Sequence, residues 1–418
     1  MPDSLEAWLA YIENQHARNI ALGLDRLMPV KLNLGQKQVC PLIIVGGTNG
    51  KGSVCAMLES ILRKAGYRIG LYTSPHLLRY NERVRIDGCP VDDRSLCAGF
   101  ARVEEARAEI PLTYFEFGTL AAWEVFSAHD LDAVILEVGL GGRLDAVNAY
   151  EPDCAVVTTV DIDHTEFLGE TREHIGLEKA GIFRAGKPAI CGDPQPPRSL
   201  VEHARLVGAD LRVLGRDFGF SRQEGQWQFH GAAIRRSGLA HPGLRGDNQL
   251  QNASVALAVL ETLQGRLPVA MQEIRRGLID VELPGRFQVL PGRPTVVLDV
   301  AHNAQGARTL ADNLAGMAFH PETWAVFGML DDKDIGAVVE ALKGRVSRWL
   351  PCDLGGPRGA TALKLASILR QHGIPGESRC FPSPAQAYAY ARGEAKEDDR
   401  ILVFGSFLTV ADAMRGSP

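Results

Sequence analysis

Apolar positions along the chain fall into short continuous runs separated by stretches with helical spacing. Four runs in the first half have the length of buried strands, at residues 41–47, 68–74, 131–139 and 153–161. Between the first two runs, residues 53–66 place apolar side chains on one stripe of a helix, and Gly66 is a typical helix stop. This alternation of strands and helices predicts an α/β fold with a mostly parallel sheet.

The pattern repeats in shorter form near the C-terminus. Three further apolar runs end in polar loops, with helical patterns between them, at residues 295–303, 323–330 and 400–407. The segment "ELPGRFQVLPGRP" ahead of them is rich in Pro and Gly, which favours a domain boundary near residues 284–290. We therefore predict two domains, residues 1–285 and residues 286–418, the second with a Rossmann-like α/β arrangement.

Two other segments complete the predicted elements. Residues 226–247 have the pattern of a β-hairpin, which adds a small β element to the first domain ahead of a helix from Asn248. Residues 1–16 combine acidic side chains with apolar ones at helical spacing, namely Leu5, Trp8, Leu9 and Ile12. This pattern predicts an amphipathic helix rather than a signal peptide. Nowhere does an apolar run reach the length of about 18 residues that predicts a membrane span.

Composition narrows the class of protein. The 418 residues are 45% hydrophobic and 23% charged, as in soluble globular proteins. The formal net charge of -5 provides no basic field, so we do not expect nucleic acid as a partner. The eight cysteines include no CxxC pair, which favours reduced thiols in a cytoplasmic protein and argues against a zinc site.

The stretch "VGGTNGKGS" at residues 45–53 approximates a phosphate-binding loop with unusual spacing. Gly50 and Lys51 fit that pattern, but Gly52 follows the lysine where a hydroxyl is expected, and Ser53 comes one residue late. The stretch follows a predicted strand and opens a predicted helix, where backbone N–H groups and the helix N-terminus favour phosphate. Lys51 would add positive charge at the β- and γ-phosphates, and Ser53 could reach a bound Mg²⁺. The alternatives are a damaged motif or a tight glycine turn.

Acidic residues follow two of the predicted strands. Glu137 lies at the carboxyl end of an apolar run, where α/β proteins bind ligands, and Asp161, Asp163 and His164 end the next run. Glu137 is therefore a candidate metal ligand, with capping or an ion pair as the alternative role. His164 is equally a structural histidine, because Mg²⁺ prefers oxygen ligands. No NKxD or TKxD stretch specifies guanine, so ATP is the favoured nucleotide and a kinase-type reaction stays open.

Seven segments together resemble the folylpolyglutamate synthase family in its bacterial bifunctional form. They are "GGTNGKGS", "GLYTSPHLLRYNERVRIDG", "TYFEFGTLAAW", "LEVGLGGRLDAVN", "DHTEFLGETREHIGLEKAGIFRAGKPAI", "LPGRFQ" and "LDVAHN". Each is weak alone, but the ordered set is specific and spans essentially the whole chain. This family belongs to the ATP-dependent amide ligases that include the Mur enzymes, and its phosphate loop has the spacing found here.

The resemblance implies a set of nucleotide and metal residues. The ATP-binding residues would be Thr48, Asn49, Gly50, Lys51, Gly52, Ser53, Asn252, Arg286 and Asp299. The ligands of two Mg²⁺ ions would be Ser74, Glu137, His164 and, as a carbamate, Lys179. Carbamylation turns a cation into an anion that can bridge metal ions. From the residues alone, the better interpretation of Lys179 is an exposed charge pair with Glu178 on a helix. A monovalent cation such as K⁺ is a further candidate cofactor.

The resemblance also implies two substrate sites. The dihydropteroate contacts would be Ile20, Ala21, Leu22, Thr113, Tyr114, Phe115, Glu116, Leu144, Asp145 and Ala146, and the glutamate contacts His302 and Ser406. Phe115 can stack on a flat heterocycle, but Tyr114, Phe115 and Phe117 ahead of a helix serve equally well as core residues. Asp299 and His302 end a predicted strand, and loop capping is the alternative role of both.

The implied reaction adds L-glutamate to 7,8-dihydropteroate and to tetrahydrofolate polyglutamates at the expense of ATP. The pteroate carboxylate attacks the γ-phosphate, and the glutamate amine then displaces phosphate from the acyl phosphate. Lys51, Lys179 and His302 would be the catalytic side chains, acting by positioning and charge stabilisation. We expect a cytoplasmic monomer.

Three other functions compete with this one. A Mur-type peptidoglycan ligase shares the chemistry, but the roughly forty residues ahead of the loop leave no room for a UDP-binding domain. A folylpolyglutamate synthase without dihydrofolate synthase activity is a closer alternative, but the resemblance of the pterin-pocket motifs favours the bifunctional form. A non-catalytic ATP-binding switch would bind ATP without glutamate-dependent ADP release.

Overall fold

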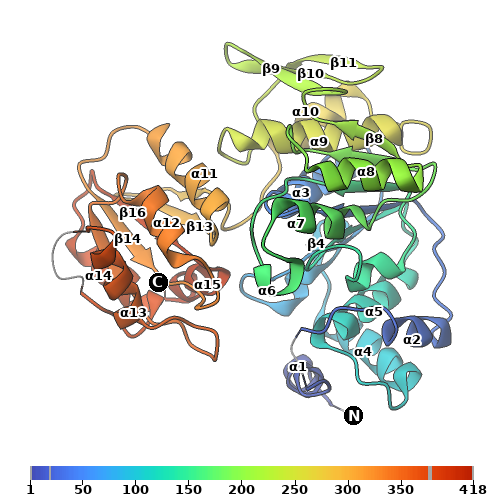
Figure 1. Cartoon of the computed structure of the whole chain (residues 1–418), viewed down its shortest axis with the longest axis horizontal. Coiled ribbons are helices and arrows are strands. Elements are labelled where there is room, and N and C mark those ends of the chain that lie inside the picture. Colours follow the sequence, from blue (N-terminus) through green and yellow to red (C-terminus); the bar gives the residue numbers. More distant parts are fainter. Residues whose placement is uncertain (1, 18–19, 375–378, 417–418) are drawn as a thin grey trace. The chain divides into compact units, whose positions relative to one another are not determined.

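A computed structural model describes residues 2–17, 20–374 and 379–416 and divides the chain into two compact units (Figure 1). The first unit comprises Met1–Gly243 and Leu250–Val281, and the second comprises Leu244–Gln249 and Glu282–Pro418. The main break therefore lies a few residues before the boundary predicted from the Pro- and Gly-rich segment. The second compact unit also includes Leu244–Gln249, which lie within the predicted first domain.

The first unit is built on an eight-stranded sheet with the order β4-β3-β2-β5-β1-β6-β7-β8. Its strands are β1 (Leu42–Gly46), β2 (Ile69–Tyr72), β3 (Val84–Ile86), β4 (Cys89–Pro90), β5 (Ala133–Glu137), β6 (Cys154–Val157), β7 (Pro188–Cys191) and β8 (Asp210–Val213). Strand β1 lies between β5 and β6 and pairs with both in parallel, whereas β3 and β4 form an antiparallel edge. The carboxyl ends of β1, β5 and β6 thus meet at one edge of the sheet.

Helices pack against the sheet of the first unit and against one another. They are α1 (Leu5–Glu13), α2 (Leu27–Asn33), α3 (Lys51–Lys64), α4 (Asp93–Arg107), α5 (Tyr114–Ser127), α6 (Thr165–Leu168), α7 (Arg172–Ala180), α8 (Arg198–Val207), α9 (Asn248–Thr262) and α10 (Met271–Ile279), with 3₁₀ turns η1 (Tyr80–Arg83) and η2 (Ala146–Ala149). Helix α3 packs on β1, β2 and β5 and on α10, and α5 packs on β2 and α4. Leu42 and Ile44 of β1 join the core that contains α5 and α4.

A small antiparallel sheet in the first unit has three strands in the order β11-β10-β9. They are β9 (Gly219–Gln223), β10 (Gln226–His230) and β11 (Arg235–Leu239), and Trp227 and Phe229 of β10 are buried. The predicted hairpin is confirmed as β10 and β11. Strand β9 was missed because its polar side chains give no buried-strand pattern.

The second unit carries a five-stranded sheet with the order β12-β13-β16-β14-β15. Its elements are β12 (Gln288–Leu290), β13 (Thr295–Asp299), β14 (Thr323–Phe327), β15 (Arg348–Pro351), β16 (Arg400–Phe404), α11 (Ala304–Ala315), α12 (Ile335–Leu342), α13 (Ala362–Gln371), α14 (Pro384–Glu394) and α15 (Phe407–Arg415). Only β12 runs antiparallel to its neighbour among these described strands. Phe327 and Phe404 stack with ring centroids 5.0 Å apart at the centre of a separate core that also holds Trp349.

The predicted fold class agrees with this arrangement in its main features: an α/β chain, a mostly parallel first sheet and a small additional β element. Differences are local. Helix α3 begins at Lys51, two residues before the predicted start, and β6 ends at Val157 rather than at Asp161. Among the described residues, no helix is both long and apolar enough to cross a membrane.

Candidate functional site

The loop between β1 and α3 depends on two glycines with positive φ. Gly47 has φ 137°, and a Cβ there would lie 1.9 Å from the Thr158 Oγ1 atom. Gly50 caps α3 with φ 90°, and a Cβ there would lie 2.6 Å from the Asn252 Oδ1 atom. Both positions therefore exclude any side chain by conformation and by space. The same contact places Asn252, predicted to bind ATP, directly against this loop.

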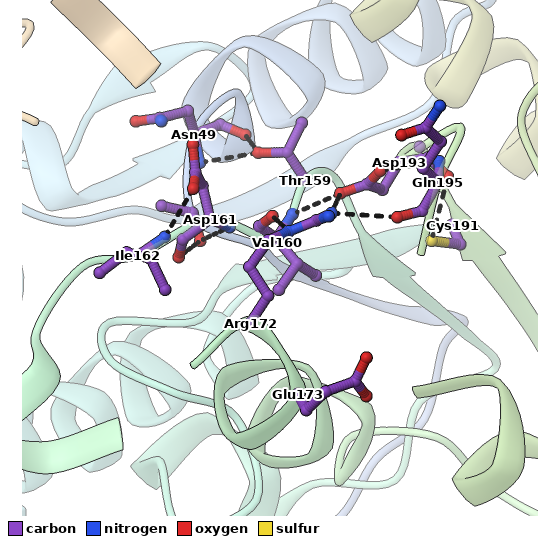
Figure 2. Close-up of polar contacts among 12 residues, drawn as sticks. Asn49, Thr159, Val160, Asp161, Ile162, Arg172, Glu173, Cys191, Asp193 and Gln195 are labelled. Carbon is purple, nitrogen blue, oxygen red and sulfur yellow. Dashed lines mark hydrogen bonds and ion pairs between the residues drawn. The ribbon is translucent and has the colours of Figure 1, made fainter. Parts of the chain in front are cut away.

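Residues just after β6 hold the loop in place, as Figure 2 shows for Asn49, Thr159 and Asp161. The Asn49 N–H donates to the Thr159 hydroxyl at 3.1 Å, and the Thr48 N–H donates to the Thr159 carbonyl at 2.7 Å. The Thr48 hydroxyl donates to the Asp161 carbonyl at 3.1 Å and accepts from the Asp161 N–H at 3.0 Å. These contacts explain why the β6 ladder stops early, because the backbone after Val157 pairs with the loop instead.

Two lysine side chains converge on one carbonyl of this loop. Lys51 Nζ donates to the Gly47 and Thr48 carbonyls at 3.0 and 3.1 Å, and Lys179 Nζ donates to the Gly47 carbonyl at 3.0 Å. Lys179 is only 4% exposed. Burial, and then the charge of Lys51, lower the pKa of Lys179 to about 7. The exposed-pair interpretation of Lys179 is therefore wrong, and Glu178 pairs with Arg143 at 2.8 Å instead.

Among the predicted metal ligands, Glu137 is a buried carboxylate in contact with Ser74. Glu137 ends β5, is 4% exposed, and accepts a hydrogen bond from the Ser74 N–H at 3.1 Å. His164 caps α6 with φ 51°, and its Nε2 atom lies 4.0 Å from the Asp163 carboxylate. The structure thus brings Ser74 to Glu137 and Lys179 to the phosphate loop. Within the described ranges, no three His, Cys, Asp or Glu side chains form a metal-binding cluster by themselves.

The chemistry of these donors fits a divalent cation when Lys179 is not protonated. The Glu137 carboxylate and the Ser74 hydroxyl are hard oxygen donors of the kind that Mg²⁺ and Mn²⁺ take. A protonated Lys179 has no lone pair and would repel a cation, but its neutral amine can form a carbamate, which supplies two oxygens. Because the pKa of Lys179 is about 7, a large fraction of that amine is neutral near physiological pH.

The predicted pterin residues gather at the start of α5. Thr113 is its N-cap and forms a capping box with Glu116, whose buried carboxylate also pairs with Arg26 at 2.9 Å. Tyr114 and Phe115 lie in the first turn of the helix rather than ahead of it. The Phe115 ring centroid is 5.9 Å from that of Tyr72, so this half-buried ring packs against the core on one side.

A second group of predicted pterin residues lies around η2. Asp145 is 3% exposed and accepts from the Leu140 and Val147 N–H groups at 2.8 and 3.0 Å. Burial raises the pKa of Asp145 to about 7, although these N–H donors oppose the shift. The Leu144 carbonyl accepts from the Gly23 N–H at 3.2 Å.

Arg26 links these two groups, although no sequence motif singles it out. Arg26 Nη2 donates to the Ala21 carbonyl at 2.7 Å while it pairs with Glu116. The segment Ile20–Leu22 is thus fastened beside Glu116 at one end and, through Gly23, beside Leu144 at the other. A lone arginine among leucines carries no sequence signal for such a role.

The predicted residues of the second unit also have structural roles. Asp299, at the end of β13, accepts from the Phe287 N–H at 2.8 Å and from the Ala301 N–H at 2.7 Å, and burial raises its pKa. Ser406 caps α15 by accepting from the Leu408 N–H at 3.1 Å. The Arg286 guanidinium lies 4.9 Å from the centroid of the Phe407 ring. Capping by Asp299, the alternative left open by the sequence, is therefore confirmed.

Comparison with known proteins places this geometry in a family. Residues 45–260 match the Mur ligase middle domain, and residues 285–407 match the Mur ligase glutamate ligase domain. A curated dihydrofolate synthase/folylpolyglutamate synthase of Escherichia coli is 45% identical over 98% of this chain and 94% of its own length. The chain belongs to the dihydrofolate synthase/folylpolyglutamate synthase branch of the Mur ligase family.

Solved structures of this family superpose on nearly the whole chain. An E. coli FolC in complex with DHPP and ADP is 44% identical, with a TM-score of 0.94 over 99% of this chain and 98% of its own. A bifunctional folylpolyglutamate synthase/dihydrofolate synthase with Mn, AMPPNP and L-glutamate bound is 44% identical, with a TM-score of 0.91 over 99% and 98% of the two chains. The phosphate loop with the unusual spacing lies within the region that matches the Mur ligase middle domain.

Proposed function

We propose that this Mur ligase family member joins L-glutamate to 7,8-dihydropteroate, forming dihydrofolate, and to tetrahydrofolate and its polyglutamates, with ATP as the energy source. The observation that carries the proposal is the Gly47 carbonyl shared by Lys51 and the buried Lys179. This shared contact brings two lysine amines to a loop of the phosphate-binding type. The chain that carries it is 45% identical to an E. coli dihydrofolate synthase/folylpolyglutamate synthase. Relatives bound to ADP with DHPP, and to AMPPNP with L-glutamate, support the same substrates.

In the first step, the chain positions ATP for attack by the pteroate carboxylate. Backbone N–H groups at the start of α3, together with Lys51, hold the phosphates and offset the charge that develops on the transferred phosphoryl group. Thr48, Asn49, Gly52, Ser53 and Asn252 complete the proposed ATP site of the first unit. In the second unit, Arg286 and Asp299 stay predicted ATP-binding residues. The anchoring of Thr48 and Asn49 supports this assignment, because it fixes the loop before ATP arrives.

A divalent cation fits the proposed site. Ser74, Glu137, His164 and carbamylated Lys179 would hold two Mg²⁺ ions, and bound Mg²⁺ supplies charge neutralisation at the phosphoryl oxygens. Mn in a solved relative supports a divalent metal. A monovalent cation such as K⁺ remains a proposed additional cofactor.

The second step needs both organic substrates to be held. The segment Ile20–Leu22, the α5 N-terminus from Thr113 to Glu116 and the turn Leu144–Ala146 would hold the pterin, with Phe115 stacked on its ring. His302 and Ser406 would hold the incoming glutamate, whose neutral amine displaces phosphate from the acyl phosphate. Positioning, rather than covalent participation by the protein, accounts for the chemistry. We propose that the chain acts as a cytoplasmic monomer.

ADP release by the purified protein tests the proposal. The assay contains ATP, Mg²⁺ and L-glutamate, with 7,8-dihydropteroate or tetrahydrofolate in separate wells. Release with both pteridines is expected. Release with tetrahydrofolate alone would restrict the function to polyglutamylation and would contradict the roles of Phe115 and Asp145. No release with either, despite ATP binding, would favour another Mur-type substrate or a non-catalytic switch.

A further inference from the structure

A second polar cluster lies behind the phosphate loop, centred on Arg172 at the start of α7 (Figure 2). Arg172 Nε donates to the Val160 carbonyl at 2.8 Å, and its Nη2 donates to the Asp193 carboxylate at 2.9 Å and to the Gln195 carbonyl at 3.0 Å. Asp193, 6% exposed, in turn accepts from the Val160 N–H at 3.0 Å. The side chains of Arg172 and Asp193 thus bind the C=O and the N–H group of Val160, respectively.

Val160 needs these partners because it lies outside the sheet. Strand β6 ends at Val157, so the Val160 peptide groups have no ladder partner, and Val160 is 1% exposed. Buried backbone N–H and C=O groups are costly when they are left unpaired. Arg172 and Asp193 meet that requirement with charge-assisted hydrogen bonds, which are stronger and more directional than neutral ones.

The position of Val160 makes this arrangement relevant to ATP. Its neighbour Thr159 binds Asn49, and its other neighbour Asp161 binds Thr48. A shift of Val160 therefore moves both contacts that hold the phosphate loop. In addition, Arg172 and Lys179 are seven residues apart on α7 and so lie on one face of that helix. Helix α7 contacts the loop directly through Lys179 and indirectly through Arg172.

We propose that Arg172 and Asp193 are positioning residues for ATP, which hold Val160 so that Thr159 and Asp161 keep Thr48 and Asn49 in a phosphate-binding conformation. This inference rests on the proposed function, because it takes the loop to be the ATP site. It adds two residues to that site, neither of which needs to touch the nucleotide. Their loss is expected to weaken ATP binding selectively.

The test measures AMPPNP affinity without metal, and the KM of each substrate in the ADP-release assay. Arg172→Ala is expected to raise the dissociation constant of AMPPNP and the KM for ATP by about tenfold, the scale of one charge-assisted hydrogen bond. The KM values for pteridine and glutamate should stay unchanged. Arg172→Lys is expected to recover part of the affinity, because lysine reaches Asp193 but lacks the planar set of donors that also serves Val160.

Glu173→Ala is the matched control, since Glu173 is adjacent on α7 and faces away from the cluster in Figure 2. Its carboxylate accepts from the Arg198 and Ser199 N–H groups at 3.1 and 2.8 Å, so its loss loosens the start of α8. It should lower Tm but leave AMPPNP affinity unchanged. The double variant Arg172→Ala, Asp193→Ala should weaken binding by less than the product of the single effects, because both side chains hold Val160.

Two results would overturn the inference: wild-type AMPPNP affinity in Arg172→Ala, or an equal loss in Glu173→Ala, which would reduce Arg172 to a general stability role. Failure of the proposed function is a separate outcome. It would appear as a wild-type protein that binds AMPPNP but releases no ADP with either pteridine.

Discussion

The two units each place a loop and a helix after a parallel strand, but they anchor that loop in different ways. In the first unit, the loop before α3 is held by residues more than a hundred positions away, through Thr159 and Asp161. In the second unit, the loop before α11 is held by residues close to it in sequence. Asp299 accepts from Ala301 and Phe287, and Asn303 accepts from the Gly306 N–H at 2.8 Å.

The two loops also differ in the charged and polar groups that they present to a ligand. The first loop has no carboxylate of its own, and two lysines approach its carbonyls. Its surroundings are therefore suited to polyphosphate. The second loop carries the imidazole of His302 and the amide of Asn303 next to each other in sequence, which suits hydrogen bonds to an amino acid. Asp299, which precedes them, is one of the proposed ATP-binding residues. The comparison predicts that variants of the first loop affect ATP and that variants of His302 in the second loop affect glutamate.

The largest expected effect comes from Lys51→Ala. Loss of one positioned charge that stabilises the transferred phosphoryl group should lower kcat by about 10²–10³-fold. Turnover under saturating ATP is the measurement. Lys187→Ala is the control, because Lys187 is a half-exposed lysine of the same unit that pairs with Asp153. Near-normal turnover of the Lys51 variant would remove the loop from the mechanism.

Gly47→Ala tests the geometry of the first loop rather than its charge. The new Cβ would collide with Thr158 Oγ1, so we expect the loop to shift and AMPPNP affinity to fall by about tenfold or more, the scale of a strained and overpacked site. Gly186→Ala is the control, since Gly186 also has positive φ, 67°, but no atom lies within 4 Å of its added Cβ. Equal affinity losses in both variants would show that the Thr158 contact is irrelevant.

His302→Ala tests the second loop. His302 Nδ1 lies 2.9 Å from the Val300 carbonyl, and this contact orients the ring beside Asp299. We expect the KM for glutamate to rise about tenfold, as for loss of one hydrogen bond to a charged group, with AMPPNP affinity unchanged. A rise in the KM for ATP alone would contradict the proposed glutamate role of His302.

The smallest effect concerns Lys179 and the pH dependence of stability. The pKa of Lys179 is about 7 in the folded protein against 10.5 for an ordinary lysine, so between these values the unfolded chain binds the extra proton. The free energy of unfolding should therefore rise with pH from about 7 upward, relative to that of Lys179→Met. Urea unfolding of both proteins in CO₂-free buffer measures this difference.

A pH-independent difference between the two proteins would contradict the lowered pKa. In a second measurement, ¹³C-bicarbonate should give a carbamate NMR signal with the wild-type protein above about pH 7 and none with Lys179→Met, since only a neutral amine reacts with CO₂. This signal reports on the lysine without any need for turnover.

Sequence patterns were sufficient to predict those parts of the structure in which the contacts join residues close in sequence. The strand, glycine loop and helix around Lys51 follow from apolar runs and turn residues, and Asp299 could be recognised as a capping residue from its own neighbours. The Thr159 contact to Asn49 could not, because it joins distant segments whose pairing depends on the finished sheet. Lys179 beside Glu178 looked exposed for the same reason, since its burial comes from the remote Gly47.

The arrangement of the two cores has a consequence for spectroscopy. The five tryptophans are divided between the two units, with Trp8, Trp123 and Trp227 in the first and Trp324 and Trp349 in the second, all at most 6% exposed. Replacing either set by phenylalanine would leave intrinsic fluorescence as a reporter of the other unit alone. Each half of the enzyme can then be observed as it melts, and a nucleotide that binds the first unit should delay the signal from that unit's tryptophans.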